Sequence, residues 1–122
     1  SWTLMKTSSA KAKGRKLQQL VRDKFIELLK PYGVVPEDIK STAMGQNGVD
    51  VQLSPFAKTF LPVAVECKNH KSMAIYKLFE QAEDYKHEGE PLLVIKANHK
   101  KPLAVVDLDY YLMLEAERIK NE

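Results

Sequence analysis

The hexapeptide VAVECK at residues 63–68 most constrains what this chain can fold into. The apolar run predicts a short strand, in which successive side chains point to opposite faces of a sheet. The odd-numbered residues, ending with Cys67, would then face a core, while Glu66 and Lys68 lie roughly 6–7 Å apart on the other face. Charges are seldom buried unless they are paired or serve a purpose. This pair is therefore either a functional acid and base or an ordinary ion pair on a half-exposed strand.

The rest of the chain alternates between helix and strand patterns. The apolar periodicity predicts helices over about 10–30, 73–88 and 108–120, and strands over 39–44, 49–53, 60–68, 92–96 and 103–106. Short connections favour an antiparallel meander for the first three strands, and the crossover from 60 to 96 favours a parallel pair. These patterns predict an α/β fold with three layers, α/β/α, around a central mixed five-stranded sheet. In the last helix, the inward-facing residues would include Tyr111.

The length of 122 residues fits a single domain, 1–122, in which residues 1–9 are expected to be a flexible basic arm. No apolar run reaches the roughly 18 residues of a membrane span, and the N-terminus lacks the apolar segment of a secretory signal. The single cysteine, Cys67, excludes an internal disulfide and a cysteine-based zinc site. An intracellular, cytoplasmic location is therefore expected.

The net charge of +3 is unevenly distributed along the chain. Residues 1–30 hold eight lysines and arginines against two acidic residues, which gives this segment a net charge of +6. A basic segment followed by a mildly acidic body suggests a polyanionic partner on one side, although many lysine-rich helix faces are merely solvated. Nucleic acid is the partner that this charge distribution favours.

Asp50 adds a second carboxylate to the polar face that carries Glu66. If their two strands pair, the carboxylates converge at one end of the sheet and repel each other unless a cation neutralises them. Hard oxygen ligands without a convincing histidine partner favour Mg²⁺, for which Mn²⁺ can substitute, over zinc. Such a metal lowers the pKa of a bound water and clamps phosphate oxygens, and Lys68 could position that water. The alternative without a function is that Asp50 is an ordinary solvated acid beside a turn.

These residues resemble the PD-(D/E)XK nuclease superfamily. The resemblance is carried by G-V-D at 48–50, a strand break, V-E-C-K at 65–68 and a following helix. It covers roughly residues 10–107, most of the chain. Within the superfamily, the small archaeal and phage Holliday-junction resolvases are the most similar in length and in order of elements.

The resemblance implies a restriction-endonuclease-like fold with a metal-dependent active site. It implies Asp50 and Glu66 as metal ligands, together with the backbone carbonyl of Cys67. It also implies that Lys68 activates or orients the attacking water.

Two further positions relate to the family pattern. Small resolvases often carry a first-helix glutamate four residues after a glycine, but here Gly14 is followed by Gln18, a neutral amide that coordinates a metal only weakly. Whether one or two metals bind is thereby left open. Gln81 begins a Q-x-x-x-Y element that resembles one in RecB-type nucleases of the same superfamily. Gln81 would then lie near the metal site, whereas for Tyr85 helix packing competes with a place near the substrate.

The predicted function is a Mg²⁺-dependent DNA endonuclease that hydrolyses phosphodiester bonds and selects DNA by its structure and not by its sequence, like a Holliday-junction resolvase. The predicted DNA contacts are Lys11, Lys13, Arg15, Lys16, Gln18, Gln46, Asn47, Asn69, His70 and Lys71. Two symmetric cuts suggest a homodimer on branched or duplex DNA, with Met113 and Leu114 at the interface. The alternatives are a nuclease of other specificity (nicking, single-strand or restriction type), a non-catalytic nucleic-acid-binding module of this fold, and a partner-binding domain.

Overall fold

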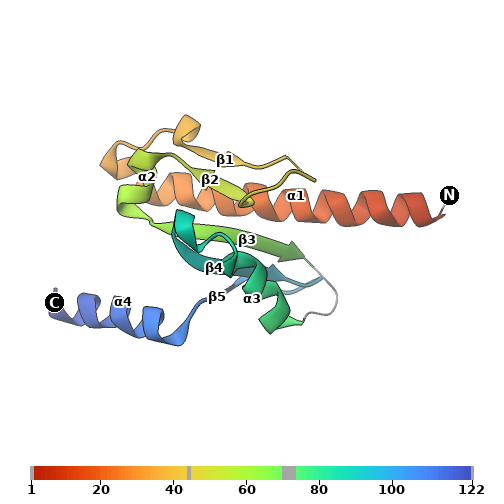
Figure 1. Cartoon of the computed structure of the whole chain (residues 1–122). Helices are drawn as coiled ribbons and strands as arrows, with labels where there is room; N and C mark the ends of the chain where they lie inside the picture. The colour runs from red at the N-terminus through yellow and green to blue at the C-terminus, as the bar shows by residue number, and fades with distance from the viewer. Residues whose placement is uncertain (1, 44, 70–73, 122) are drawn as a thin grey trace.

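The computed structural model describes residues 2–43, 45–69 and 74–121 (Figure 1). In these ranges the chain is an α/β structure built on a five-stranded mixed sheet. The elements in chain order are α1 (Trp2–Leu29), β1 (Ile39–Ser41), β2 (Val51–Leu53), α2 (Pro55–Phe60), β3 (Val63–Asn69), α3 (Ile75–Glu83), β4 (Glu90–Lys96), β5 (Leu103–Val105) and α4 (Leu108–Lys120). Short 3-10 helices cover Lys30–Tyr32, Pro36–Asp38 and Lys86–Glu88.

The sheet has the spatial order β1-β2-β3-β4-β5, so sequence neighbours are also neighbours in space. β3 and β4 run parallel, joined by the α3 crossover, and the other three pairs are antiparallel. This is the mixed sheet that the connection lengths predict. The register partners Val51 and Val65 join β2 to β3, and the parallel pair extends from Val63 beside Glu90 to Asn69 beside Lys96.

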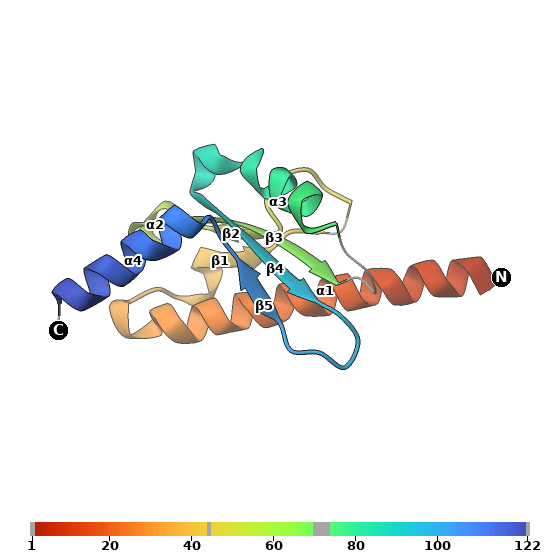
Figure 2. The same ribbon diagram turned by 90° about the horizontal axis from the view of Figure 1, so that it is seen from below.

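The two faces of the sheet are covered by different helices. In Figures 1 and 2, α1 lies along one face and α3 on the other. Val65 and Cys67 of β3 belong to the main hydrophobic core together with Leu17 and Val21 of α1. Each such burial contributes roughly 1.5–3 kcal/mol. The alternation predicted for residues 63–68 is therefore present, with Glu66 on the face opposite α1.

α1 is longer than the sequence pattern predicts. It runs without interruption from Trp2 to Leu29, so the expected flexible arm at residues 1–9 is wrong for residues 2–9. Gly14 stands inside the helix, where it costs roughly 1 kcal/mol, less than would be needed to end it. The helix stops before Pro31, and Gly33 then adopts a φ of 89°. In Figure 1 the N-terminal turns of α1 extend past the sheet.

The segment after β2 contains a helix, α2, that the sequence analysis treated as a strand break. Ser54 caps this helix by accepting a hydrogen bond from the Ala57 amide at 3.1 Å, and Pro55 occupies its first turn. Proline is well tolerated there because that amide has no partner within the helix. β3 consequently begins at Val63 rather than at Phe60.

Other boundaries shift by a few residues. β1 ends at Ser41 and β2 begins at Val51, so both strands are shorter than predicted. The predicted helix over 73–88 divides into α3, which ends at Glu83, and the 3-10 helix from Lys86 to Glu88.

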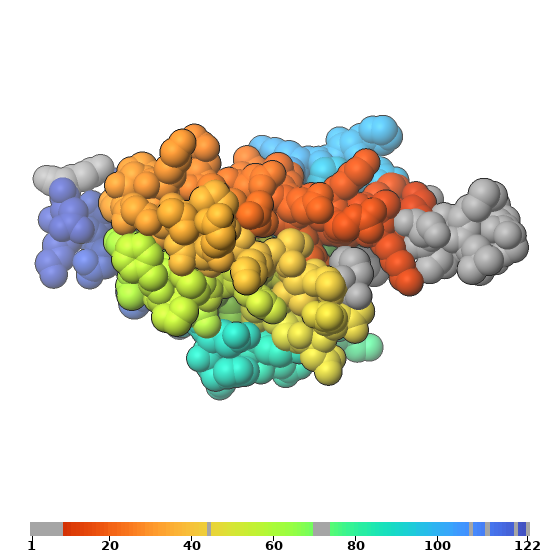
Figure 3. All heavy atoms as spheres, turned by 90° about the horizontal axis from the view of Figure 1, so that it is seen from above, coloured from red at the N-terminus to blue at the C-terminus, as the bar shows by residue number. Residues whose placement is uncertain are grey.

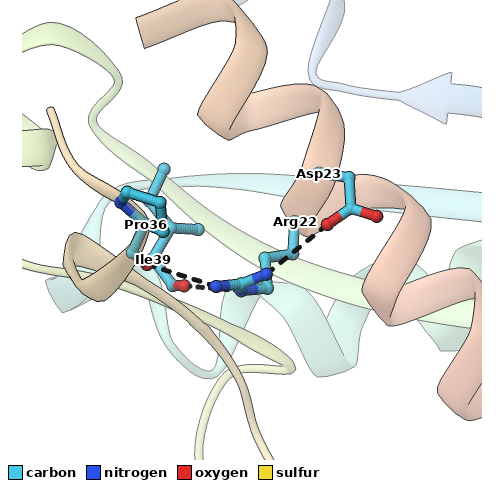
Figure 4. Close-up of polar contacts among 4 residues, drawn as sticks. All are labelled: Arg22, Asp23, Pro36 and Ile39. Carbon is cyan, nitrogen blue, oxygen red and sulfur yellow. Dashed lines mark hydrogen bonds and ion pairs between the residues drawn. The ribbon is translucent and has the colours of Figure 1, made fainter. Parts of the chain in front are cut away.

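Arg22 fastens α1 to the start of β1 (Figure 4). Its Nε donates to the carbonyl of Ile39 at 2.8 Å, and a terminal nitrogen donates to the carbonyl of Pro36 at 3.3 Å. The other terminal nitrogen lies 3.5 Å from Asp23. Charged donors to buried-edge carbonyls contribute more than neutral ones. Arg22 thus fixes the angle at which the first strand lies on the helix.

α4 occupies its predicted range but does not cover the sheet. Figure 2 shows it extending away from the strands. The prediction that Tyr111 faces inward is wrong, because this residue is 47% exposed. Met113 and Leu114 are also exposed. Within the described ranges, no helix is both long enough and apolar enough to cross a membrane.

Gly89 permits the close approach of β4 to β3. Its φ is 150°, and a Cβ there would lie 2.6 Å from the backbone carbonyl of Pro62. The next residue, Glu90, donates its amide to that same carbonyl at 2.8 Å. Any side chain at Gly89 would therefore separate the starts of the two parallel strands.

Candidate metal and nucleic-acid site

Asp50 and Glu66 meet where the pairing of β2 with β3 ends. The amide of Asp50 donates to the carbonyl of Val65 at 2.9 Å, so Asp50 lies beside Glu66 on the same face. The Asp50 carboxylate accepts a hydrogen bond from the Cys67 amide at 2.8 Å. The two carboxyl groups are also hydrogen-bonded to each other. The structure therefore brings together the two acids that the sequence places on neighbouring strands.

Lys68 completes this cluster. Its Nζ lies 3.6 Å from Oε1 of Glu66, and the two side chains are 29% and 11% exposed. The strand spacing alone predicts this contact, because residues 66 and 68 share a face. One ammonium group faces two carboxyl groups, so the cluster carries excess negative charge when both carboxyl groups are ionised.

The carboxyl groups respond to this crowding. Burial, reinforced by the charge of Asp50, raises the pKa of Glu66 to about 7 against the opposing effect of Lys68. Burial also raises the pKa of Asp50, opposed by the Cys67 amide and by Lys68. The hydrogen bond that Asp50 accepts from the Cys67 amide favours its ionised form, so Glu66 is the partner that retains a proton more readily. Near neutral pH the pair therefore holds a proton that a bound cation would displace.

Cys67 has two distinct parts. Its thiol faces the core below α1, and burial raises the thiol pKa, so this sulfur is chemically inert at neutral pH. Its amide points toward Asp50. In a strand, the N–H and C=O of one residue point to the same side, so the Cys67 carbonyl also faces Asp50. That carbonyl is placed to act as a third oxygen ligand.

A cavity of about 330 Å³, here called the site cavity, opens beside this cluster. One wall is the middle of α1 and the other is the turn before Asp50, and Figure 3 shows this yellow turn lying against α1. Glu66 does not line the cavity itself, but it contacts Asp50 and Lys68, which do. The lining consists of Ala10, Lys11, Gly14, Gln18, Ala43, Gly45, Gln46, Asp50, Cys67, Lys68 and Asn69.

Gln18 lies at the first-helix position to which the family resemblance points. It is 5% exposed, lines the site cavity, and accepts a hydrogen bond from the Ser41 hydroxyl at 2.8 Å. The helix therefore delivers this residue to the cavity as expected. Its side chain is a neutral amide held by β1.

Tyr85 supports the turn that precedes Asp50, a contact that the sequence analysis missed. The Gly48 amide donates to the Tyr85 hydroxyl at 3.3 Å. Gly48 has a φ of 109°, a conformation that other residues rarely adopt. The Thr42 hydroxyl also donates to the Val49 carbonyl. The Q-x-x-x-Y spacing drew attention to Tyr85, but its partner across the fold has no signal in the sequence.

The predicted DNA contacts are distributed over two neighbouring cavities. Those lining the site cavity are Lys11, Gln18, Gln46 and Asn69. Those lining a second cavity beside it are Lys13, Lys16 and again Asn69. The structure thus groups most of the described candidates on one side of the molecule.

The remaining predicted residues are not gathered there. Arg15 and Asn47 are exposed and line neither cavity. Gln81 is exposed on α3 and does not line the site cavity, so its place near a metal stays a prediction. His70 and Lys71 lie outside the described residues.

The donor set fits a hard divalent cation. Among the described residues, no group of three or more His, Cys, Asp or Glu side chains is arranged to hold a metal. Mg²⁺, however, keeps several waters and commonly binds through one or two carboxylates. Asp50, Glu66 and the Cys67 carbonyl offer oxygen ligands only, and burial of the two neighbouring carboxyl groups disfavours ionisation of both unless a cation binds. Zinc would require softer nitrogen or sulfur ligands.

No family model, curated protein or solved structure matches this chain. The resemblance to PD-(D/E)XK nucleases therefore depends on the motif residues and on how the fold arranges them. Asp50, Glu66 and Lys68 are the residues on which that comparison depends, and they form one contiguous cluster.

Proposed function

We propose that this chain is a Mg²⁺-dependent DNA endonuclease with a restriction-endonuclease-like fold of the PD-(D/E)XK type. The observation that carries this proposal is the contact between the Asp50 and Glu66 carboxyl groups, with Lys68 3.6 Å from Glu66 beside a cavity walled by α1. A cluster of two desolvated carboxyl groups and one ammonium group is costly unless it binds something. A phosphodiester with its divalent cation complements both signs of charge.

Each residue of the cluster has a role in this proposal. Asp50, Glu66 and the Cys67 carbonyl would hold the metal, which supplies an acidified water and neutralises phosphate oxygens when bound. The Cys67 amide keeps Asp50 oriented, since it holds Oδ2 at 2.8 Å. Glu66 releases its proton when it becomes a ligand. Lys68 Nζ, placed beside Glu66, donates to the attacking water or to a phosphate oxygen and so stabilises developing charge.

The walls of the site cavity suit a DNA backbone. Lys11 on α1, Gln46 on the turn before Asp50 and Asn69 at the end of β3 all line the cavity. Lysine and amide side chains of this kind bind phosphates and give salt-dependent binding that is largely independent of sequence. We therefore propose structure-selective cutting, as in Holliday-junction resolvases. Two such sites would act in a homodimer, for which the exposed Met113 and Leu114 of α4 offer an apolar surface.

The test is cleavage of a labelled four-way junction, a duplex and a single strand under titration with Mg²⁺ and with Mn²⁺. We expect paired, symmetric cuts in the junction by the wild type. The variant Glu66→Gln removes the ligand charge at similar size, and Glu37→Gln, at an exposed residue outside the site cavity, is the matched control. Activity that disappears in the first variant and persists in the second supports the proposal. Cleavage that both variants retain would overturn it.

A second candidate is a non-catalytic nucleic-acid-binding module of the same fold. The observation in its favour is Gln18, which places a neutral amide in the cavity where small resolvases often carry an acid. Tight DNA binding without cutting under either metal would support the module. Activity gained by Gln18→Glu would then show that the missing carboxylate is the reason.

A further inference from the structure

The second cavity, here called the lysine cavity, lies directly beside the site cavity. It has a volume of about 400 Å³, within the range of small-molecule sites, and Asn69 lines both cavities. α1 forms one side, and the ends of β3 and β4 with the following turn form the other. The adjacency follows from the register, because Asn69 and Lys96 are partners at the ends of the parallel strands.

The charge of the lysine cavity is of one sign. Lys13, Lys16 and Lys96 line it, and none of its described lining residues is acidic. Lys13 Nζ donates to the Asn98 side-chain oxygen at 3.0 Å, which bridges α1 to the turn after β4. Lys96 Nζ donates to the Ala97 carbonyl at 3.2 Å. Three lysine side chains around one hollow make it a favourable place for an anion.

The base of the cavity, in contrast, is aliphatic. Leu17 is buried in the core, while Leu20, on the same side of α1, remains 37% exposed. An inorganic anion gains nothing from such a surface, but the flat apolar face of a nucleobase does. The side-chain amides of Asn69 and Asn98 at the rim suit the polar edge of a base. Apolar base, amide rim and lysines together match a nucleotide better than a phosphate alone.

The turn that closes the cavity is conformationally strained. His99 lines the cavity and, in the described part of the chain, is the non-glycine residue with a positive φ, 60°. This conformation costs on the order of 1 kcal/mol for a side chain of this kind, and such costs are concentrated at binding sites. The hydrogen bond from Lys13 to Asn98 ties the turn to α1 in this conformation.

We propose that the lysine cavity binds one nucleotide of the DNA strand that has left the base stack next to the cleaved phosphate. Leu17 and Leu20 contact the base, Asn69 and Asn98 contact its edge, and Lys13, Lys16 and Lys96 contact the flanking phosphates. The inference rests on the proposed function in taking DNA as the substrate. It names the feature of DNA that is selected, an unpaired nucleotide. Unstacking is least costly at branches, bulges and ends, so these substrates bind best.

The experiment measures binding by fluorescence anisotropy in a metal-free buffer with chelator, so no cleavage is needed. The probes are a fully paired duplex, the same duplex with a one-nucleotide bulge, and the same duplex with an abasic bulge. We expect the full-length chain to bind the base-containing bulge about tenfold more tightly than the other two probes. Leu20→Ser should remove this preference while binding of the duplex and the abasic bulge stays unchanged.

Two further variants control for folding and helix surface. Leu28→Ser changes a leucine that is 56% exposed on the same helix but outside the cavity, and it should keep the preference. Asn98→Ala, in the exposed turn, should lower the preference severalfold without affecting the core. Equal binding of the abasic and the base-containing bulge, or a preference that survives in both Leu20→Ser and Asn98→Ala, would overturn the inference.

Free deoxyadenosine monophosphate separates the two sources of a nucleotide. We expect it not to displace bulged DNA when present at the same concentration as the DNA, because it lacks the second flanking phosphate. Displacement at equal concentration would make the free nucleotide the ligand and overturn the strand-bound form. If the bulge preference depends on Leu20 but no DNA is ever cut, the endonuclease proposal falls and this site stands. If junctions are cut without any such preference, only this inference falls.

Discussion

The site cavity and the lysine cavity are neighbours with different patterns of charge, mixed in the first and basic in the second. Beside the first, two carboxyl groups face one ammonium group, and burial raises the pKa of Glu66 to about 7. In the second, three lysines line a hollow whose described lining includes no acid. Asn69 belongs to both. The Asp50 and Glu66 carboxyl groups beside the first cavity therefore offer a place for a cation, whereas the lining of the second cavity favours an anion.

The difference suggests that the site cavity carries out the cleavage chemistry and that the lysine cavity binds the DNA. Acidic residues occur where β2 leaves β3, and basic residues occur where β3 and β4 end together. A DNA strand lying across the end of β3 would meet both. Changes in the site cavity should then affect the rate of cutting, and changes in the lysine cavity should affect affinity. The predictions below test that division.

The largest effect is expected from the acids of the site cavity. Glu66→Gln removes a metal ligand while keeping the side-chain shape, so the cleavage rate should fall by about 10³-fold or more. DNA affinity without metal should stay the same or rise, because a negative charge has been removed. Single-turnover cleavage and anisotropy measure the two quantities, with Glu37→Gln as control. A loss of DNA affinity as large as the loss of cleavage rate would contradict the separate roles of the two cavities.

Lys68 should matter for rate as well. Lys68→Ala removes the ammonium group 3.6 Å from Glu66, and we expect a fall in kcat of about 10²-fold with little change in KM. Lys68→Arg should recover part of the rate, because it restores the charge. Lys77→Ala, at an exposed lysine of α3, is the control for loss of a positive charge. A change confined to KM would assign Lys68 to DNA binding and not to the chemical step.

Stability without metal should fall as the pH rises. Glu66 has a pKa of about 7 in the folded chain against an ordinary 4.5, so the folded state holds a proton that the unfolded state has released. Its contribution, about 3 kcal/mol, is fully present below pH 4.5 and is lost as the pH rises through 7.

Glu66→Gln cannot ionise and should show no such loss. Urea unfolding in chelator at about pH 8 should find this variant more stable than the wild type by up to about 3 kcal/mol. Mg²⁺ should restore the stability of the wild type but not change that of the variant. Equal pH profiles for the two proteins would contradict the buried, shared proton.

The lysine cavity should control affinity and its salt dependence. Lys16→Gln removes one phosphate contact, so DNA binding should weaken severalfold and the slope of log affinity against log salt should decrease by about one. The cleavage rate at saturating DNA should not change. Lys24→Gln, at an exposed lysine of α1 outside both cavities, serves as the control. Identical salt slopes for the two variants would remove the lysine cavity from DNA binding.

The smallest effect is expected from Tyr85, which supports the wall of the site cavity indirectly. Tyr85→Phe removes the hydroxyl that accepts the hydrogen bond from the Gly48 amide. This loss should destabilise the conformation of the turn by about 1 kcal/mol. We expect a twofold to fivefold fall in kcat, roughly that energy, and faster hydrogen exchange of the Gly48 amide. Tyr76→Phe changes a tyrosine that is 88% exposed and should alter neither quantity.

Local sequence patterns predicted much of the fold correctly. The period of two in residues 63–68 predicted correctly which side of β3 faces the core, and the crossover through α3 predicted the parallel pair. The helix α2 was not predicted, although the sequence indicates it, because Ser54 followed by Pro55 is a typical helix start. The error at residues 2–9 arose because these residues lack the apolar periodicity from which the helix over 10–30 was predicted, although α1 includes them.

The candidate site was predictable only in part. Asp50 and Glu66 lie on adjacent strands joined by a short connection, so their convergence follows from chain order. Asn98 and His99 meet α1 only after five strands have assembled, and no local pattern places them beside Lys13. The same holds for Tyr85 and Gly48, which are 37 residues apart. Contacts of that range depend on packing, which sequence periodicity does not encode.

The hydrogen bond from the Cys67 amide to Asp50 makes one side chain part of the sheet itself. This carboxylate takes the place that a neighbouring strand's carbonyl would fill, so its rotamer is set as soon as β2 and β3 pair. A ligand arriving there would not have to immobilise that side chain, because folding has already done so. Because one side chain serves both the sheet and the site, substitutions at Asp50 affect both. Asp50→Asn keeps an acceptor for the Cys67 amide, whereas Asp50→Ala would weaken the sheet and the site together.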